Sequence, residues 1–310
     1  MTGGAGFIGS HLCDRLLAEG RAVVAVDDLS SGHVANLVDA RGHGARFTFV
    51  NLDIRSEGLA SLVDRHRPRV VVHLATRPER IGETDPAPEA SVGVMGSLNV
   101  LEAAARCGVE KVVVAMGASV YGEQRRVPIQ ERALARARPR SASAASWKTV
   151  LDYLQFYRRH RRLDHVVLIM GTVYGPRQYP ADERGVVAAF AGRMLQGSRP
   201  VVVGDGAQTR DLVFVDDAVH ALSLALDRGS GRSLNVGTGV ETSVNALFRR
   251  LAKITGFRGP PERAPGPIDA PGRSSLDNAA ATRELGWKPW THLEDGLRET
   301  VAFLREASPS

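Results

Sequence analysis

The alternation of short apolar runs with helical patterns is the feature that most constrains the fold of this chain. Strand-like runs are predicted at residues 21–28, 46–54, 69–75, 111–118, 164–171 and 199–204. Helical patterns lie between them at 10–20, 57–67, 92–108 and 140–160. Because the strand-like runs are apolar on both faces, they are typical of a parallel sheet covered by helices on each side. We therefore predict an α/β fold with a doubly wound parallel sheet.

The alternation breaks down after about residue 175, where proline and glycine become frequent. This change predicts a smaller, mixed C-terminal lobe. We place the first domain at residues 1–165 and the lobe mainly at 166–310, with 199–240 partly returning to the first domain.

Composition excludes several classes of protein. The formal net charge of +6 is spread along 310 residues, and aromatic residues make up only 5%, so no basic stripe for nucleic acid is expected. No apolar run is long enough to cross a membrane, and no signal peptide is recognised. The two cysteines, Cys13 and Cys107, lack metal-ligand spacing and favour a reducing compartment. These features predict a cytoplasmic protein.

A glycine-rich turn begins the chain at residue 3. The segment Gly3-Gly4-Ala5-Gly6-Phe7-Ile8-Gly9 has the spacing G-x-x-G-x-x-G directly before a predicted helix. Such a turn normally follows a buried strand of about five residues, for which two residues leave no room. We favour a true start upstream, with a valine codon read as the initiator methionine. In the alternative the first strand is truncated, and dinucleotide binding is then in doubt.

Acidic residues end the next two strand-like runs. The glycines Gly3, Gly6 and Gly9, with Phe7 and Ile8, predict a turn whose backbone N–H groups face a pyrophosphate. Asp27, followed by Asp28, lies where a carboxylate binds an adenosine ribose, which favours NAD over NADP. Asp53 and Ile54 are expected beside the adenine. The competing interpretation is that these acids only solvate strand ends.

Ten motifs in order carry a resemblance to a known family: TGGAGFIGSHL, VDDLSSG, LDIR, VVHLA, GSLNVLEAA, SVYGE, VYGPRQ, VGDGAQTRDLVFVDDAV, NVGTG-ETSV and ELGWKP. Along its whole length the chain resembles the extended short-chain dehydrogenases, and specifically the NAD-dependent epimerase/dehydratase family that acts on nucleotide sugars. The resemblance implies a Rossmann-type N-terminal domain, a C-terminal lobe for a nucleotide-diphosphate sugar, and a homodimer. It also implies that His73 of VVHLA packs under the sheet edge.

The family's catalytic pattern is altered in this chain. The resemblance implies a tyrosine and a lysine on one helix, and a Ser or Thr four residues before the tyrosine of V-Y-G. Gly117 stands four residues before Tyr121. The ungapped register, which we favour, puts Ser143 at the tyrosine position and Trp147 at the lysine position. A slip of one residue would put Ala144 and Lys148 there. Neither register supplies the phenol that such a base requires.

The substrate half keeps more of the family pattern. Arg210 and Arg273 match arginines that grip the nucleotide diphosphate, Arg177 is a weaker match, and Thr172 replaces an asparagine that helps to hold the diphosphate. Gly93 replaces an asparagine that supports the fold around the cofactor. In the loop 76–86, four charged residues are candidates for acid–base chemistry or a metal site, although solvated loop charges are the simpler interpretation. They are Glu79, Arg80, Glu83 and Asp85.

Three functions remain open at this point. The leading hypothesis is a nucleotide-sugar isomerase, epimerase or pyranose–furanose mutase that does without the tyrosine–lysine hydride mechanism and uses a divalent metal. The second is an NAD-dependent nucleotide-sugar 4-epimerase or dehydratase with a substitute base, for which Tyr121, Glu79, Ser143 and Lys148 are weak candidates. The third is a non-catalytic nucleotide-sugar-binding partner subunit.

Overall fold

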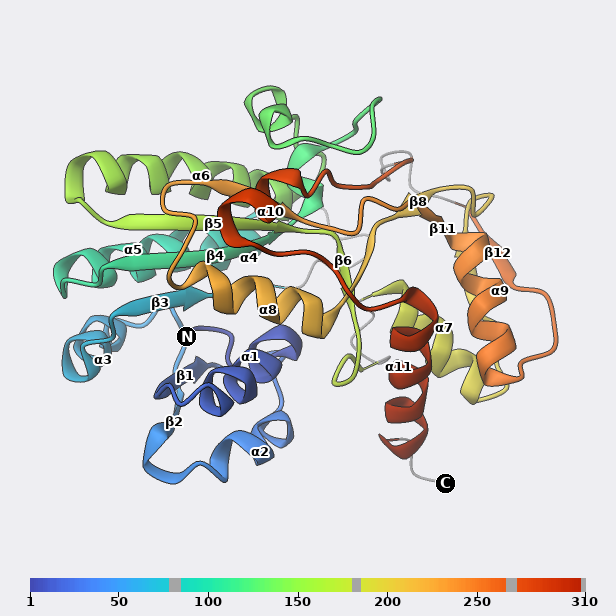
Figure 1. The fold of residues 1–310 in the computed structure, drawn as a ribbon, viewed down its shortest axis with the longest axis horizontal. Coiled ribbons are helices and arrows are strands. Elements are labelled where there is room, and N and C mark those ends of the chain that lie inside the picture. Colours follow the sequence, from blue (N-terminus) through green and yellow to red (C-terminus); the bar gives the residue numbers. More distant parts are fainter. Residues whose placement is uncertain (78–84, 180–184, 266–271, 308–310) are drawn as a thin grey trace.

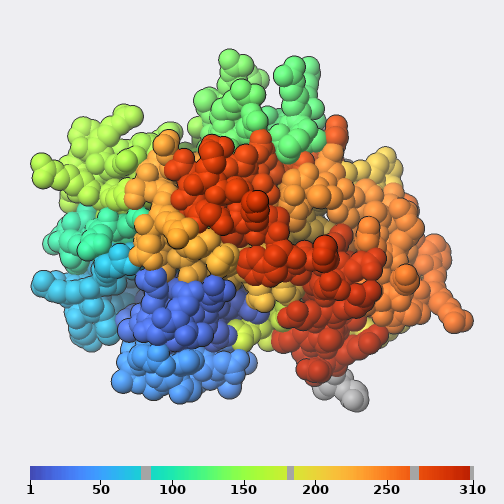
Figure 2. Space-filling model, in the orientation of Figure 1, coloured from blue at the N-terminus to red at the C-terminus, as the bar shows by residue number. Residues whose placement is uncertain are grey.

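The computed structural model describes residues 1–77, 85–179, 185–265 and 272–307. A central sheet with helices on both faces forms one side of the molecule in Figure 1, and a smaller group of helices and short strands forms the other. In the space-filling view the orange and red C-terminal segments lie against the blue N-terminal ones (Figure 2). Within the described residues, no helix is long and apolar enough to cross a membrane.

The central sheet is parallel throughout. One part has two paired strands, β1 (Val23–Asp27) and β2 (Phe47–Asn51). The other has the order β10-β5-β4-β3 and consists of β3 (Val70–His73), β4 (Lys111–Gly117), β5 (Asp164–Met170) and β10 (Ser233–Val236). Thr2 forms parallel bridges to Val26 of β1 and His73 of β3, and so joins the two parts.

Side chains of the central strands alternate between two hydrophobic cores. In β4 and β5, Val113 and Val166 belong to one core, whereas Val112 and Val167 belong to the other. The first core includes side chains of α1 (Phe7–Ala18), α8 (Val215–Ala225) and α10 (Ala279–Leu285). The second includes side chains of α3 (Gly58–His66), α5 (Ser97–Arg106) and α6 (Ala142–Arg161). Helices therefore cover both faces, as expected for strands apolar on both sides. The predicted Rossmann-type α/β class is confirmed.

Short helical elements complete this part of the chain. They are α2 (Val38–Arg41), α4 (Ala87–Ala90), the π-helix η3 (Ser91–Gly96), and four 3₁₀ turns: η1 (Val34–Leu37), η2 (Gly44–Arg46), η4 (Ala118–Tyr121) and η5 (Glu131–Arg136). The predicted helix 92–108 is thus a π-helical turn followed by α5.

Within residues 172–179, 185–265 and 272–307, the smaller group of elements contains three helices and three two-stranded sheets. The helices are α7 (Val186–Leu195), α9 (Val244–Thr255) and α11 (Leu293–Ala307). The strand pairs are β6 (Thr172–Tyr174) with β9 (Leu212–Phe214), β7 (Val201–Val203) with β12 (Glu262–Ala264), and β8 (Thr209–Arg210) with β11 (Thr242–Ser243).

Two sequence predictions concern this second region. The run 199–204 does form a strand, β7, but β7 pairs with β12 and not with the central sheet. Strand β10 returns to the central sheet from within 199–240. Strand β5 runs across the predicted boundary at residue 165, and the division into two domains stays a prediction.

His73, at the end of β3, is fully buried and holds a short chain of hydrogen bonds. The Ser97 hydroxyl donates to the Gly93 carbonyl (2.6 Å), so His73 Nε2 is the donor to Ser97 Oγ (2.9 Å). His73 Nδ1 then accepts from the Thr2 hydroxyl (2.7 Å). Burial, together with the nearby amino group of Met1, lowers the pKa of His73 to about 4.

Acidification should therefore destabilise the fold through His73. Its folded-state pKa lies below the unfolded value of about 6.5, so its neutral form stabilises the protein above that pH. This stability is lost as the pH falls from about 6.5 towards 4, by about 2 kcal/mol at pH 5. We expect urea unfolding at pH 7 and pH 5 to show a smaller loss in His73→Asn than in the unaltered protein. An equal loss in both would contradict the assignment.

Candidate active site

A cleft of about 710 Å³ lies at the carboxyl ends of the central strands, where ligands bind in open parallel sheets. It extends from the glycine-rich turn, past the ends of β1 and β4, to the beginning of α6 and to the segment after β5. The residues that line it include Gly3, Gly6, Phe7, Ile8, Gly9, Asp27, Asp28, Asp53, Ile54, Ser119, Ser143, Trp147 and Arg177.

The glycine-rich turn has no space for a side chain at Gly3 or Gly9. Gly3 has φ +70°, and a Cβ atom there would lie 2.7 Å from the backbone nitrogen of Ala75. A Cβ atom on Gly9 would lie 2.0 Å from the carbonyl oxygen of Gly3. Gly6 is the N-cap of α1, so the free N–H groups of the first helical turn face the cleft. This end of the cleft is suited to an anionic group such as a pyrophosphate.

Asp27 connects the glycine-rich turn to the end of β1. Its Oδ2 accepts from the N–H of Ala5 and its Oδ1 from the N–H of Leu29, each at 2.9 Å. Burial raises the pKa of Asp27, and these two hydrogen bonds oppose that shift. Asp27 thus shapes the turn, and it also lines the cleft at the position predicted for the ribose.

Asp53 and Ile54 also line the cleft, as predicted for the adenine end. The guanidinium of Arg55 donates to both carboxylate oxygens of Asp53, which lowers the pKa of Asp53. Arg55 also donates to Ser91 Oγ (3.1 Å), so it links this loop to η3. Sequence reasoning did not single out Arg55, although LDIR was among the motifs.

The first two turns of α6 place two of the predicted positions in the cleft. Ser141 caps the helix by accepting from the N–H of Ala144. Ser143 and Trp147, four residues apart, then face the cleft on one side of the helix. The Trp147 indole is buried, and its ring lies edge-on to His73 with 6.2 Å between centroids.

Lys148 points away from the cleft. Its Nζ donates to the backbone carbonyl of Leu134 in η5 (3.0 Å), and Lys148 does not line the cleft. Ala144 is buried. The slipped register would assign Ala144 and Lys148 to the catalytic positions. In this geometry the ungapped pair, Ser143 and Trp147, faces the cleft instead.

Tyr121 also lies outside the cleft, so the structure corrects its candidacy as a base. The side chain is fully buried in the second core, and its hydroxyl donates to Asn235 Oδ1 (2.6 Å). Burial, with the nearby charge of Glu131, raises the pKa of Tyr121. A buried phenol with a raised pKa, bonded to β10, does not reach a substrate in the cleft.

Two glycines that replace family residues differ in the space around them. A Cβ atom on Gly93 would lie 2.5 Å from Glu89 Oε1 and 3.0 Å from Ser146 Cβ, so Glu89 and Ser146 fill that space. A Cβ atom on Gly117 would meet only Ser119 Oγ, at 3.6 Å. A serine is therefore tolerated at residue 117. Ser119, which lines the cleft, was missed because it lies two residues from the expected hydroxyl position.

Arg210 and Arg273 are brought together around β8 and β11. Glu241 accepts hydrogen bonds from the Thr209 hydroxyl (2.7 Å) and from Arg273 Nε (2.9 Å). Arg210 follows Thr209 directly and pairs with Thr242 across the two strands. Burial lowers the pKa of Arg210. The two arginines predicted to hold a diphosphate thus lie in the second region, and neither lines the cleft of about 710 Å³.

Arg177 and Thr172 are placed differently from those arginines. The Arg177 guanidinium lies on the glycine-turn side of the cleft and donates to Asp14 of α1 (2.7 Å) and to Asp39 of α2 (3.1 Å). Thr172 begins β6, and its N–H donates to the carbonyl of Asp211 (2.7 Å). Gly171 and Val173, on either side of Thr172, line the cleft, whereas Thr172 does not.

The charged loop after β3 is described only in part. Glu79, Arg80 and Glu83 lie outside the described residues, whereas Asp85 accepts a hydrogen bond from the N–H of Ala87, the first residue of α4 (3.0 Å). Among the residues that the structure describes, no group of three or more metal-ligating His, Cys, Asp or Glu side chains is found.

Comparison with known proteins identifies the family. A family model described as the NAD dependent epimerase/dehydratase family matches residues 1–237. This chain belongs to that family. The UDP-glucose 4-epimerase of Mycolicibacterium smegmatis is 42% identical over 311 residues, which cover 99% of this chain and 98% of that protein.

Solved structures of family members agree over the same length. The UDP-glucose 4-epimerase of Thermotoga maritima, solved with UDP-glucose, is 39% identical and superposes with a TM-score of 0.93 over 99% of this chain and 98% of that one. The UDP-glucose 4-epimerase of Thermus thermophilus, solved with NAD, is 35% identical with a TM-score of 0.90 over the same shares. The predicted membership of the extended short-chain dehydrogenases is thereby confirmed. The relatives give no support to a mutase type.

The geometry around Tyr121 predicts that this residue serves the fold and not the chemistry. In Tyr121→Phe the buried Asn235 Oδ1 loses its donor, so the free energy of unfolding should fall by about 1–2 kcal/mol. Affinity for cleft ligands and any turnover should stay unchanged. Chemical denaturation and ligand titration of the two proteins test this, and loss of turnover without loss of stability would contradict it.

Proposed function

We propose that this protein binds NAD in the cleft and a nucleoside-diphosphate hexose beside it, with the sugar reaching into the cleft, and catalyses slow epimerisation at C4 of the sugar. The observation that carries the proposal is the continuity of the cleft. It joins the glycine-rich turn and Asp27 at one end to Ser119 and Ser143 at the other. A dinucleotide that begins at the glycine turn would bring its reactive end to these two hydroxyls.

The residues present fit the ADP-ribose half of NAD well. The glycine-rich turn admits no Cβ atom at Gly3 or Gly9, the N-terminus of α1 faces it, and Asp27 lies at the end of β1. These groups would hold the pyrophosphate and the ribose, and Asp53 with Ile54 would border the adenine. When bound, NAD supplies a reversible acceptor for the hydrogen at C4. The buried Trp147 would pack beside the nicotinamide end.

The substrate class rests on the arginine cluster and on the relatives. Arg210 and Arg273 are guanidinium groups suited to bidentate contact with phosphates, and Glu241 holds Arg273 in place. The relatives from Mycolicibacterium smegmatis and Thermotoga maritima carry the name UDP-glucose 4-epimerase. A UDP-hexose is therefore the substrate that we propose.

In the proposed reaction, the step that the cleft residues assist least is removal of the proton from the sugar hydroxyl. A tyrosine phenol has an unperturbed pKa of about 10, and a neighbouring lysine can lower it further. The hydroxyls of Ser119 and Ser143 are far weaker acids and have no lysine beside them in the cleft. They can hydrogen-bond the sugar hydroxyl, but its proton must pass to water. We therefore propose a low turnover rate.

One specific observation favours a second candidate, a nucleotide-sugar-binding partner subunit without turnover. Trp147 fills with an apolar indole the position at which the family pattern has a cation. Complete loss of the base would leave a cleft that binds both ligands and changes neither.

Restoring the two side chains on α6 should raise the turnover of UDP-glucose. We expect the double variant Ser143→Tyr with Trp147→Lys to increase kcat by about 100-fold, the lower end of the range for a positioned acid–base group. Adding Gly117→Ser, for which the structure has space, should raise it further. NMR detection of UDP-galactose, with saturating NAD, measures this.

Controls separate chemistry from folding in this test. Trp147→Lys removes a buried indole, so far-UV circular dichroism and NAD titration must first establish that the variant folds. Ser143→Tyr alone keeps Trp147 and should give a smaller gain, while Lys148→Met should leave kcat unchanged. If the folded double variant binds both ligands and shows no turnover, the proposal fails and the binding subunit is favoured.

The diphosphate role of the arginines gives an independent prediction. Arg210→Gln should raise the Kd for UDP by about 10-fold, because it removes a charge-assisted contact. The Kd for NAD should not change. The matched control is Arg298→Gln on α11, an exposed arginine that pairs with Glu294 and Asp295 and should leave both Kd values unchanged. Isothermal titration calorimetry measures both ligands, and equal effects of the two substitutions would contradict the assignment.

A further inference from the structure

Asp211 is the single residue between β8 and β9, and it does not line the cleft. Its side chain is fully buried. A buried carboxylate is costly to the fold unless hydrogen bonds satisfy it, so the partners of this group indicate what it does. Asp211 directly follows Arg210, one of the two arginines proposed to hold the diphosphate.

Four donors from two later segments of the chain converge on this carboxylate. Its Oδ1 accepts from the N–H of Thr238 (2.7 Å) and from the Thr238 hydroxyl (2.6 Å). Its Oδ2 accepts from the N–H of Gly239 (3.0 Å) and from the N–H of Leu276 (2.9 Å). Burial raises the pKa of Asp211, and these hydrogen bonds oppose that shift. The carboxylate thus binds both segments at one point.

These two segments carry Glu241 and Arg273. Glu241 follows Gly239 by two residues, and Arg273 precedes Leu276 by three. The Arg273 guanidinium donates to both carboxylate oxygens of Glu241. Asp211 therefore holds beside β8 the two segments from which this ion pair is built.

The backbone of Asp211 contacts the wall of the cleft. Its carbonyl accepts from the N–H of Thr172 (2.7 Å), at the start of β6. A Cβ atom on Gly171, which lines the cleft, would lie 2.7 Å from that carbonyl oxygen, so the two backbones pack with no space for a side chain. Arg210 and Arg273 do not line the cleft themselves. Asp211 therefore connects both arginines to the cleft wall.

We propose that Asp211 is a positioning residue of the diphosphate site. Its carboxylate holds Arg273 and Glu241 beside Arg210, and its carbonyl fixes the distance from these arginines to the cleft. A sugar on the bound diphosphate is thereby directed into the cleft, although Asp211 does not touch the ligand. The inference rests on the proposed function, because it requires a diphosphate at these arginines.

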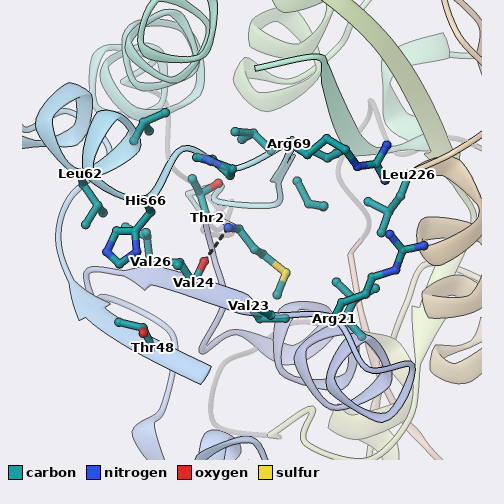
Figure 3. Close-up of a pocket in the computed structure, with 18 of the residues that line it drawn as sticks. Thr2, Arg21, Val23, Val24, Val26, Thr48, Leu62, His66, Arg69 and Leu226 are labelled. Carbon is teal, nitrogen blue, oxygen red and sulfur yellow. Dashed lines mark hydrogen bonds between the residues drawn. The ribbon is translucent and has the colours of Figure 1, made fainter. Parts of the chain in front are cut away.

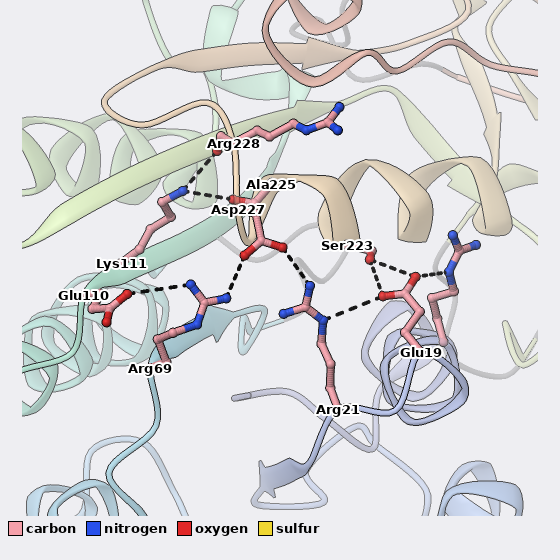
Figure 4. Close-up of polar contacts among 10 residues, drawn as sticks. Glu19, Arg21, Arg69, Glu110, Lys111, Ser223, Ala225, Asp227 and Arg228 are labelled. Atoms are coloured by element: carbon pink, nitrogen blue, oxygen red, sulfur yellow. Dashed lines mark hydrogen bonds and ion pairs between the residues drawn. The ribbon is translucent and has the colours of Figure 1, made fainter.

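Asp227 offers a matched control at the other end of the central sheet. It also joins distant segments, because it accepts from Arg21, just before β1, and from Arg69, just before β3, each at 2.7 Å (Figure 4). Both arginines line a cavity of about 470 Å³ between β1 and β3 (Figure 3). This network lies at the amino ends of the strands, whereas the cleft lies at their carboxyl ends. Asp227→Asn therefore alters a comparable carboxylate away from the diphosphate site.

The test measures the Kd values for UDP and NAD by isothermal titration calorimetry. In Asp211→Asn one carboxylate oxygen becomes an amide NH₂ group, which cannot accept from the N–H that faces it. We expect the Kd for UDP to rise about 10-fold, the effect of losing a hydrogen bond to a charged group, and the Kd for NAD to stay unchanged. Asp227→Asn should leave both Kd values unchanged.

A double-mutant cycle separates positioning from a general loss of stability. If Asp211 acts through Arg273, adding Asp211→Asn to Arg273→Gln should raise the Kd for UDP by less than about 2-fold beyond the single variant. Thr238→Val keeps the carboxylate and removes one donor, so it should raise the Kd for UDP about 3-fold. This variant carries the test if Asp211→Asn fails to fold, which far-UV circular dichroism and NAD titration establish.

The outcomes distinguish this inference from the proposed function. If Arg210→Gln weakens UDP binding while Asp211→Asn and Thr238→Val do not, the positioning role is overturned and the proposed function stands. A further 10-fold rise on adding Asp211→Asn to the Arg273 variant would also overturn the positioning role. If the unaltered protein binds no UDP, the proposed function fails, and this inference fails with it.

Discussion

The pairing of Thr2 with β1 and β3 is the interaction on which the rest of the structure depends. The six strands of the central sheet form two groups, and the bridges of Thr2 to Val26 and His73 join them. The Thr2 hydroxyl also begins the buried chain of hydrogen bonds through His73 to Ser97 of α5. The glycine-rich turn follows directly, so the position of Thr2 sets where the N-terminus of α1 points. The geometry at the cofactor end of the cleft and the continuity of the central sheet therefore both depend on the short segment that begins at Thr2.

At the opposite end of the cleft, the helix is kept while the predicted catalytic positions hold other side chains. The capped helix α6 and its buried face are intact, and Ser143 and Trp147 occupy neighbouring turns on the cleft side. An indole there contributes packing against His73, whereas a lysine would contribute charge. Because the helix is anchored by its other buried side chains, its chemistry could change without loss of the fold. This separation would let a chain resemble its relatives over its full length while departing from the tyrosine–lysine pair that the family resemblance implies.

Elements with a clear period were predictable from the sequence, and long-range partners were not. The runs predicted at 21–28 and 111–118 became β1 and β4 because they are apolar on both faces. Tyr121 was proposed as a base because its motif is local, but its hydroxyl is bonded to Asn235, 114 residues away. The role of Lys148 was also unpredictable from the sequence. Its hydrogen-bond partner, the backbone carbonyl of Leu134, lies in the short 3₁₀ turn η5, which has no clear period in the sequence. The run 199–204 has strand composition, yet composition does not specify whether its partner is β12 or the central sheet.

The central claim is that NAD-dependent chemistry at C4 proceeds in this cleft without a phenol or an ammonium group to assist it. The most direct measurement is NMR of UDP-glucose incubated with the unaltered protein and NAD in D₂O. Transfer of the C4 hydrogen to NAD and back keeps that hydrogen out of exchange with solvent, whereas proton abstraction would exchange it. The account predicts slow formation of UDP-galactose that retains protium at C4. Deuterium at C4, or no UDP-galactose from a protein that binds both ligands, would contradict it.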